Sequence, residues 1–185
     1  MAINDFIEAF AKYGSDKSGF HTYEYVYDNL FEDRSMVSEI LEVGIAYGGS
    51  ARAWKSLFPN AMITGLDNNV GTLFHEERIV SLYADQTKEW TLDNFVKIAR
   101  DTKYDLIIDD GCHSLNETVL TFRKLLPLLK HGGVFVVEDI REDLLPSWIE
   151  IVEELKSHGY KYTLYNMMDK ATCYDDNIVI TVEHS

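Results

Sequence analysis

The sequence predicts an α/β fold: a mostly parallel sheet of seven strands that carries helices on both faces and an antiparallel hairpin at one edge. Two observations predict it. Short, continuously apolar runs alternate with segments whose apolar residues recur at helical spacing, which is typical of parallel strands buried on both faces. The last two apolar runs are instead joined by a short polar connection, residues 166–177, which favours an antiparallel pairing of these two strands.

Each element follows from apolar periodicity and from glycine stops. An N-terminal helix buries positions 3, 6, 7 and 10 and ends at Gly14, and residues 14–27 form a polar, aromatic-rich loop with a short helix. Strands are predicted at residues 39–43, 61–66, 79–83, 104–108, 134–137, 160–165 and 178–182, and the helices between them at 48–58, 92–99, 115–129 and 148–155. Residues 1–185 are expected to form a single domain in which residues 1–35 are an N-terminal helical cap segment.

Composition limits the classes of function. With 185 residues, 46% of them hydrophobic, the chain can bury one sizeable core. The 31 acidic residues outnumber the 17 basic ones and give a formal charge of −14, which disfavours nucleic acid and anionic membranes as partners. No apolar run approaches the roughly 20 residues of a membrane span, residues 1–20 do not resemble a signal peptide, and two cysteines cannot build a disulfide framework. A cytoplasmic protein is therefore expected.

A glycine-rich turn follows the first predicted strand, in residues 40–50. Its glycines and the helix start after it can bind a ligand, although a tight turn without a ligand would show the same pattern. Asp67 ends the second strand, where a carboxylate can accept hydrogen bonds from both hydroxyls of a ribose. Asp85 and Gln86 end the third strand and can bond to an adenine edge. Glu42 would repel the pyrophosphate of NAD but attract the ammonium group of S-adenosylmethionine, so the sequence favours the latter.

Carboxylates gather at the ends of the fourth and fifth predicted strands, at Asp109, Asp110, Glu138 and Asp139. The carboxyl ends of neighbouring parallel strands meet at one edge of a sheet, and carboxylates crowded there need a cation to balance them. An oxygen-only ligand set favours magnesium or calcium over zinc. His113 follows Asp110 closely, where its imidazole can act as a general base near pH 7 or reach the same ion. Taken singly, each of these residues could equally be a helix cap or a turn residue.

On these residues the chain resembles the class I S-adenosylmethionine-dependent methyltransferases. More narrowly, it resembles the metal-dependent O-methyltransferases that modify sugars of macrolides and related natural products, a group that includes cephalosporin hydroxylase-like proteins. The resemblance spans nearly the whole chain. It rests on Gly14-Ser15-Asp16-Lys17 with His21 and Tyr25, Leu41-Glu42-Val43-Gly44, Asp67, Asp85-Gln86, Asp109-Asp110-Gly111-Cys112-His113, and Gly132-Gly133 through Glu138-Asp139. Cys112 stands where serine is usual, and Ala46 and Ala84 replace common glycines.

The resemblance implies a Rossmann-like methyltransferase domain that uses S-adenosyl-L-methionine and Mg²⁺. It implies that Asp110, Glu138 and Asp139 hold the metal, and that His113, next to the catalytic Asp110, is the base. The residues assigned to the cofactor are Glu42, Gly44, Ala46, Tyr47, Gly48, Ser50, Asp67, Asn68, Asp85, Gln86, Asp109 and Lys17.

We therefore expect a Mg-dependent O-methyltransferase that acts on a hydroxyl of a sugar in a glycoside or glycan. Three alternatives stay open: a catechol-type O-methyltransferase, an NAD-linked oxidoreductase, and a non-catalytic binding protein. Glu42 and the incomplete glycine fingerprint disfavour the oxidoreductase, and the intact acidic cluster disfavours the binding protein. The expected partner is a small-molecule or glycan acceptor, not nucleic acid or a membrane, and a homo-oligomer is left open.

Overall fold

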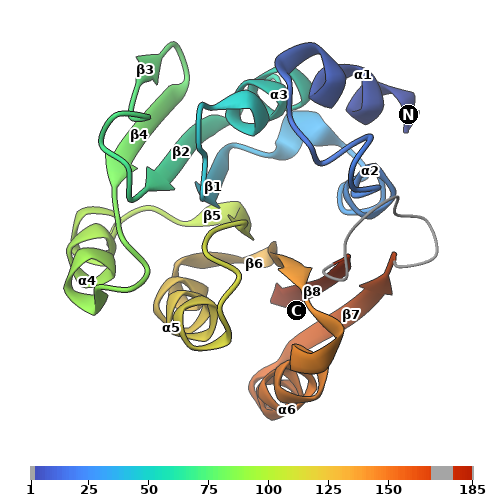
Figure 1. Cartoon of the computed structure of the whole chain (residues 1–185), viewed down its shortest axis with the longest axis vertical. Coiled ribbons are helices and arrows are strands. Elements are labelled where there is room, and N and C mark those ends of the chain that lie inside the picture. The colour runs from blue at the N-terminus through green and yellow to red at the C-terminus, as the bar shows by residue number, and fades with distance from the viewer. Residues whose placement is uncertain (1–2, 168–176, 185) are drawn as a thin grey trace.

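The continuously apolar runs of the sequence form the centre of an eight-stranded sheet with the order β3-β4-β2-β1-β5-β6-β8-β7 (Figure 1). The computed structural model describes residues 3–167 and 177–184. The strands are β1 (Glu39–Val43), β2 (Met62–Asp67), β3 (His75–Glu76), β4 (Ile79–Tyr83), β5 (Tyr104–Asp109), β6 (Leu129–Ile140), β7 (Tyr160–Asn166) and β8 (Ile178–His184). β4, β2, β1, β5 and β6 pair in parallel, and β8 runs antiparallel to both β6 and β7. The predicted parallel sheet with an antiparallel edge hairpin is confirmed.

Three elements differ from the prediction. The additional strand is β3, which pairs antiparallel with β4. Because it has two residues, it is too short to show a period in the sequence. The helix predicted at 115–129 ends at Leu125, because a 3₁₀ turn with Pro127 follows and a proline cannot donate the helical backbone hydrogen bond. The last predicted parallel strand is longer than expected, since β6 continues through Gly132 and Gly133.

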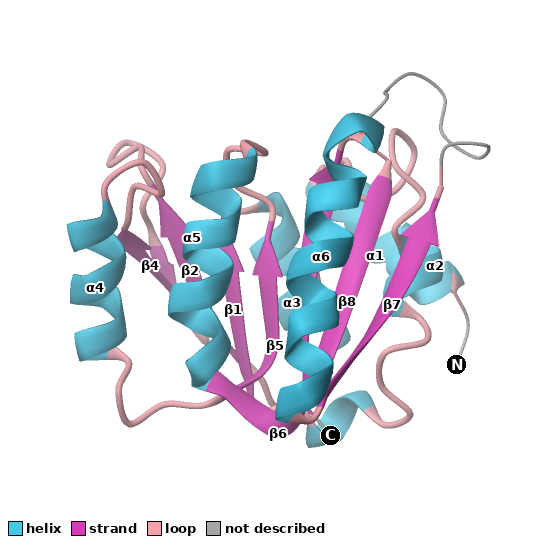
Figure 2. Cartoon of the chain, turned by 90° about the horizontal axis from the view of Figure 1, so that it is seen from below, coloured by secondary structure: helices cyan, strands magenta, loops and turns pink. Residues whose placement is uncertain are grey.

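Helices cover both faces of the sheet. They are α1 (Asn4–Tyr13), α2 (Glu24–Tyr27), α3 (Gly49–Leu57), α4 (Glu89–Ile98), α5 (Leu115–Leu125) and α6 (Leu145–Leu155). α4, α5 and α6 lie on one face, and α1, α2 and α3 on the other (Figure 2). None of the helices in the described part of the chain is long and apolar enough to cross a membrane.

Each face has its own apolar core. On the α1–α3 face the buried indole of Trp54 meets the ring of Phe10 edge-on, with 5.1 Å between the ring centroids and an angle of 89°. On the α4–α6 face Phe122 contacts Trp148 in the same way, at 5.7 Å and 85°. These two layers pack against the sheet from both sides, and the carboxyl ends of its parallel strands form one edge between them.

Backbone strain is concentrated at this edge. The non-glycine residues with positive φ among the described residues are Ala46 (43°), Arg78 (60°), His113 (54°) and Asp139 (54°). Three of these four follow or end β1, β5 and β6, where side chains were predicted to bind a cofactor or a metal. Residues in the left-handed region cost about 1–3 kcal/mol and cluster at functional sites.

Candidate functional site

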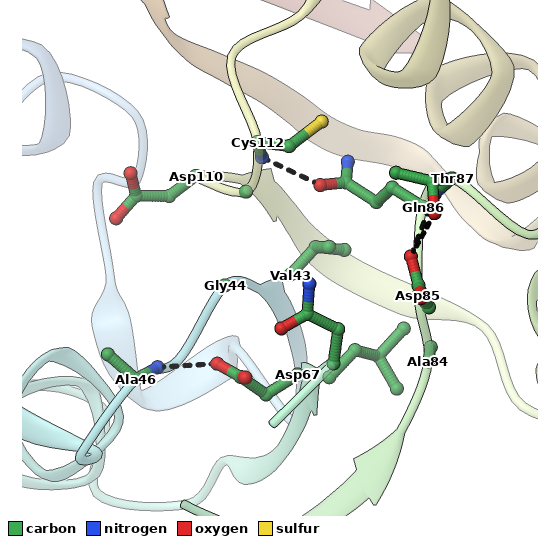
Figure 3. Close-up of a pocket in the computed structure, with 13 residues that line it drawn as sticks. Val43, Gly44, Ala46, Asp67, Ala84, Asp85, Gln86, Thr87, Asp110 and Cys112 are labelled. Carbon is green, nitrogen blue, oxygen red and sulfur yellow. Dashed lines mark hydrogen bonds between the residues drawn. The ribbon is translucent and has the colours of Figure 1, made fainter. Parts of the chain in front are cut away.

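A cavity of about 250 Å³ opens at the carboxyl ends of β1, β2, β4 and β5 (Figure 3). It lies where an open α/β sheet is expected to bind its ligand. Its lining residues are Val43, Gly44, Ala46, Leu66, Asp67, Asn68, Ala84, Asp85, Gln86, Thr87, Asp110, Gly111 and Cys112. Six of the predicted cofactor-binding residues therefore line it: Gly44, Ala46, Asp67, Asn68, Asp85 and Gln86.

The glycine turn after β1 shapes one wall of the cavity. Gly44 has φ +88°, and a Cβ added there would lie 2.0 Å from the backbone oxygen of Asp110, so only glycine lets the turns after β1 and β5 approach this closely. The backbone N–H of Ala46 donates to Oδ2 of Asp67 at 2.9 Å (Figure 3). The backbone N–H of Asn69 donates to Oδ1 at 2.8 Å. The side chain of Asp67 is thus held in place at the cavity wall.

The opposite wall is built by Gln86. Its Oε1 accepts a hydrogen bond from the backbone N–H of Cys112 at 2.8 Å, and its Nε2 donates to both oxygens of Asp109, at 2.9 and 3.1 Å. Asp109 is 1% exposed and does not line the cavity, and burial raises its pKa to about 7. Asp109 contacts the lining of the cavity through Gln86 and through the backbone N–H of Gly111, which donates to its Oδ1 at 3.2 Å.

The remaining predicted cofactor residues do not line this cavity. Tyr47 is 82% exposed, and Gly48 is the N-cap residue before α3, with the ring of Phe74 against it. Glu42 is fully buried: Ser50 Oγ donates to its Oε2 at 2.8 Å, and Lys17 Nζ lies 3.5 Å from its Oε1. The carboxylate that the sequence assigned to a cofactor ammonium group thus faces an ammonium group of the chain itself.

Lys17 is the central cation of the carboxylate cluster, which is formed by Glu42, Asp110, Glu138 and Asp139. Its side chain is 1% exposed, and its Nζ donates to Oδ2 of Asp110 at 2.6 Å and to Oε2 of Glu138. Burial lowers the pKa of Lys17, but Asp110, Glu138 and Glu42 outweigh this and hold it well above its ordinary value. In turn, burial raises the pKa of Asp110, and the Lys17 ammonium outweighs it, so the pKa of that carboxyl lies below its usual range.

Two phenols from the N-terminal segment complete the cluster. The hydroxyl of Tyr27 donates to Oε1 of Glu138 at 2.6 Å, and that of Tyr23 donates to Oδ1 of Asp139. Burial, followed by the negative charge of the carboxylate that each contacts, raises the pKa of both phenols, which therefore stay protonated as donors. Each oxygen of Glu138 accepts a hydrogen bond, from Lys17 or from Tyr27, whereas Oδ2 of Asp139 is left open toward His113.

His113 lies between the open oxygens of the two aspartates. Its Nε2 is 3.4 Å from Oδ1 of Asp110 and 3.3 Å from Oδ2 of Asp139, and it is buried without hydrogen-bond geometry to either. Burial lowers the pKa of His113, but Asp110, Asp139 and Asp109 outweigh it and raise the pKa to about 9. A divalent cation among these carboxylates would oppose this rise.

Ligand atoms of Asp110, His113 and Asp139 all lie within 4.8 Å of one another, the grouping a metal ion requires. Two carboxylate oxygens and an imidazole nitrogen without a hydrogen-bond partner fit a divalent cation, and the oxygens fit Mg²⁺ in particular. Glu138 is not part of this group among the described residues. Its predicted role as a ligand stays a prediction; its two oxygens accept hydrogen bonds from Lys17 and Tyr27.

The roles of Tyr23, Tyr27 and Asn177 were not predicted from the sequence. Asn177, just before β8, places its Oδ1 2.7 Å from Nδ1 of His21. A signal for the two tyrosines does exist: they stand four residues apart in the aromatic-rich segment that carries Lys17 and His21. Their carboxylate partners lie more than a hundred residues away, and local patterns do not reveal such pairs.

The chain is similar to known methyltransferases. The model of a family described as a methyltransferase domain matches residues 41–140, more than half of the chain. The 8-demethyl-8-alpha-L-rhamnosyl tetracenomycin-C 2'-O-methyltransferase of Streptomyces olivaceus is 32% identical over 145 residues, which are 74% of this chain and 38% of that protein. The mycinamicin VI 2''-O-methyltransferase of Micromonospora griseorubida is 34% identical over 145 residues, 74% of this chain and 36% of that protein. The chain thus spans little more than a third of the length of these relatives.

A solved structure extends the similarity to the whole fold. The MycE methyltransferase from the mycinamycin biosynthetic pathway, in complex with Mg and SAH, superposes with a TM-score of 0.75 and 28% sequence identity. The match covers 97% of this chain and 54% of that one.

Proposed function

The chain belongs to the methyltransferase domain family, and we propose that it is an S-adenosylmethionine-dependent, Mg-dependent O-methyltransferase that acts on a hydroxyl of a sugar in a small glycoside or glycan. One observation carries the proposal: Asp110 takes part in both halves of the site. It lines the cavity at the ends of β1, β2 and β4, and its Oδ1 faces His113 in the carboxylate cluster. A methyl donor in the cavity would lie beside a cluster able to deprotonate an acceptor.

The cavity supplies the groups that a nucleoside needs. Asp67, pinned by two backbone N–H groups, can accept hydrogen bonds from ribose hydroxyls, and Asp85 and Gln86 lie at the far wall for the adenine. The relatives support the donor and the acceptor: one is named as the 2'-O-methyltransferase of a rhamnosyl tetracenomycin, another as the 2''-O-methyltransferase of mycinamicin VI, and MycE was solved with SAH and Mg. The net charge of −14 also favours a neutral acceptor over a nucleic acid.

In the proposed reaction the acceptor oxygen attacks the sulfonium methyl group, the methyl–sulfur bond breaks, and the hydroxyl proton passes to Nε2 of His113. Asp110 and Asp139, together with Glu138, would hold the Mg²⁺. Bound there, the ion supplies Lewis acidity that lowers the pKa of the attacking hydroxyl. The walls formed by Gly44 and Gln86 orient the donor, so that proximity contributes to the rate.

The test is a methyl-transfer assay with isotopically labelled S-adenosylmethionine and a panel of glycosides that carry vicinal hydroxyls, read by mass spectrometry. We expect one labelled methyl group on a sugar hydroxyl in the presence of Mg²⁺ and none in EDTA, while calorimetry still shows SAH binding in EDTA. Methylation of a catechol but of no glycoside would favour the catechol-type alternative, and binding of NAD in place of SAH would favour an oxidoreductase. Full turnover in EDTA would show that the carboxylates have another role.

A further inference from the structure

Tyr23 links the N-terminal segment to the carboxylate cluster. It precedes α2, its side chain is 1% exposed, and its hydroxyl donates to Oδ1 of Asp139, 116 residues further along the chain. Its ring stacks on His21, with 4.7 Å between the ring centroids and an angle of 23°. His21 is itself fixed by Asn177, so the phenol is held in place on more than one side.

The hydrogen bond from Tyr23 decides where the other oxygen of Asp139 points. A carboxylate can rotate about the bond to its Cβ, and the strained backbone of Asp139, at φ +54°, does not restrict that rotation. With Oδ1 held by the phenol, Oδ2 lies 3.3 Å from Nε2 of His113 and converges with Oδ1 of Asp110. Nδ1 of His21 also lies near Oδ1, but at 3.7 Å it is beyond hydrogen-bond distance.

Lys17 acts in the same way on Asp110, since it binds Oδ2 and leaves Oδ1 open toward His113. The two aspartates are therefore arranged alike: the outer oxygen is bound by a donor from the N-terminal segment, and the inner oxygen faces the point where the three ligand atoms meet. Partners that hold the metal ligands in this manner fix their orientation and their affinity for the ion.

We propose that Tyr23 is a positioning residue of the metal site, which keeps Oδ2 of Asp139 directed at the cation. The proposal rests on the proposed function, because that function assigns the cation to this cluster. Tyr23 lies outside residues 41–140, the part of the chain that the family model matches.

The test compares the metal affinity of the wild-type protein with that of Tyr23→Phe, by calorimetry with Mg²⁺ and no cofactor. Phe keeps the ring and its stacking on His21 and removes only the donor. We expect Tyr23→Phe to bind Mg²⁺ about 10- to 100-fold more weakly, the usual effect of removing a partner of a metal ligand. The matched control is Tyr104→Phe, which removes a phenol hydroxyl from a buried residue at the opposite end of β5 and should leave the affinity unchanged.

A rescue variant separates the hydrogen bond from the shape of the side chain. With para-aminophenylalanine at position 23, an N–H donor replaces the hydroxyl at the same end of the ring, and metal affinity should return close to wild type. Wild-type affinity in Tyr23→Phe, or no rescue by the amino group, would overturn the proposal. If Tyr23→Phe does not fold, the variant with para-aminophenylalanine is the test. Weaker Mg²⁺ binding by that variant than by the wild-type protein would contradict the proposal. Absence of Mg²⁺ binding to the wild-type protein would instead count against the proposed function.

Discussion

Replacing His113 by alanine is expected to lower kcat by a factor of about 10² to 10⁴, the usual effect of removing a general base. Of the three candidate metal ligands Asp110, His113 and Asp139, His113 is the one that offers a nitrogen, whereas Mg²⁺ prefers the carboxylate oxygens of the two aspartates. The imidazole is therefore available to take the proton of the acceptor hydroxyl. Because it is not needed to hold either ligand, His113→Ala should keep the wild-type affinities for Mg²⁺ and SAH.

Steady-state kinetics and calorimetry on the same preparation check this result. His158→Ala is the control, because His158 lies in the turn after α6 and outside both the cavity and the cluster. Loss of Mg²⁺ binding in His113→Ala, with kcat recovering at high metal concentration, would make His113 a ligand and leave the base elsewhere.

Replacing Lys17 by methionine is expected to reduce the free energy of unfolding by about 3–5 kcal/mol, the usual cost of removing one partner of a buried ion pair. Methionine has nearly the length of lysine without its charge. The change leaves Glu42 and Glu138, both fully buried, and Asp110 without the ammonium group that binds them. Urea unfolding in the absence of metal measures the effect.

Lys124→Met is the matched control for this substitution. Lys124 also bridges two carboxylates, with its Nζ 2.6 Å from Asp93 and 2.7 Å from Glu89, but these carboxylates are exposed. Exposed pairs contribute about 0–1 kcal/mol, so this variant should unfold near the wild-type midpoint. Similar losses in both variants would show that burial of the Lys17 cluster has no special energetic weight.

The fold could be predicted from the sequence because each parallel strand is buried on both faces and therefore consists of an almost continuous run of apolar residues. The predicted runs 39–43, 61–66 and 104–108 placed β1, β2 and β5 within one residue at each end. The two-residue β3 was missed, since two residues carry no period. The end of α5 was misplaced because the apolar stripe continues through Pro127 into β6, although the α-helix does not.

The site could be predicted where its residues follow strands, and only there. Asp67, Asp85 and Asp110 lie at strand ends, so the parallel topology alone brings them to one cavity. The interactions of Lys17 and Tyr23 are different, because their partners are set by how the N-terminal segment crosses the sheet edge. A pairing across 93 or 116 residues leaves no local pattern, which is why Lys17 was assigned to the cofactor rather than to Asp110.

The central claim is that a methyl donor and a divalent cation bind side by side at the carboxyl ends of β1, β2, β4, β5 and β6. A crystal structure of the protein grown with SAH and Mn²⁺, with anomalous diffraction recorded at the manganese edge, tests it most directly. We predict an anomalous peak within bonding distance of Oδ1 of Asp110 and Oδ2 of Asp139, and SAH in the cavity with its ribose on Asp67. A peak elsewhere, or SAH bound away from Asp67, would contradict the account.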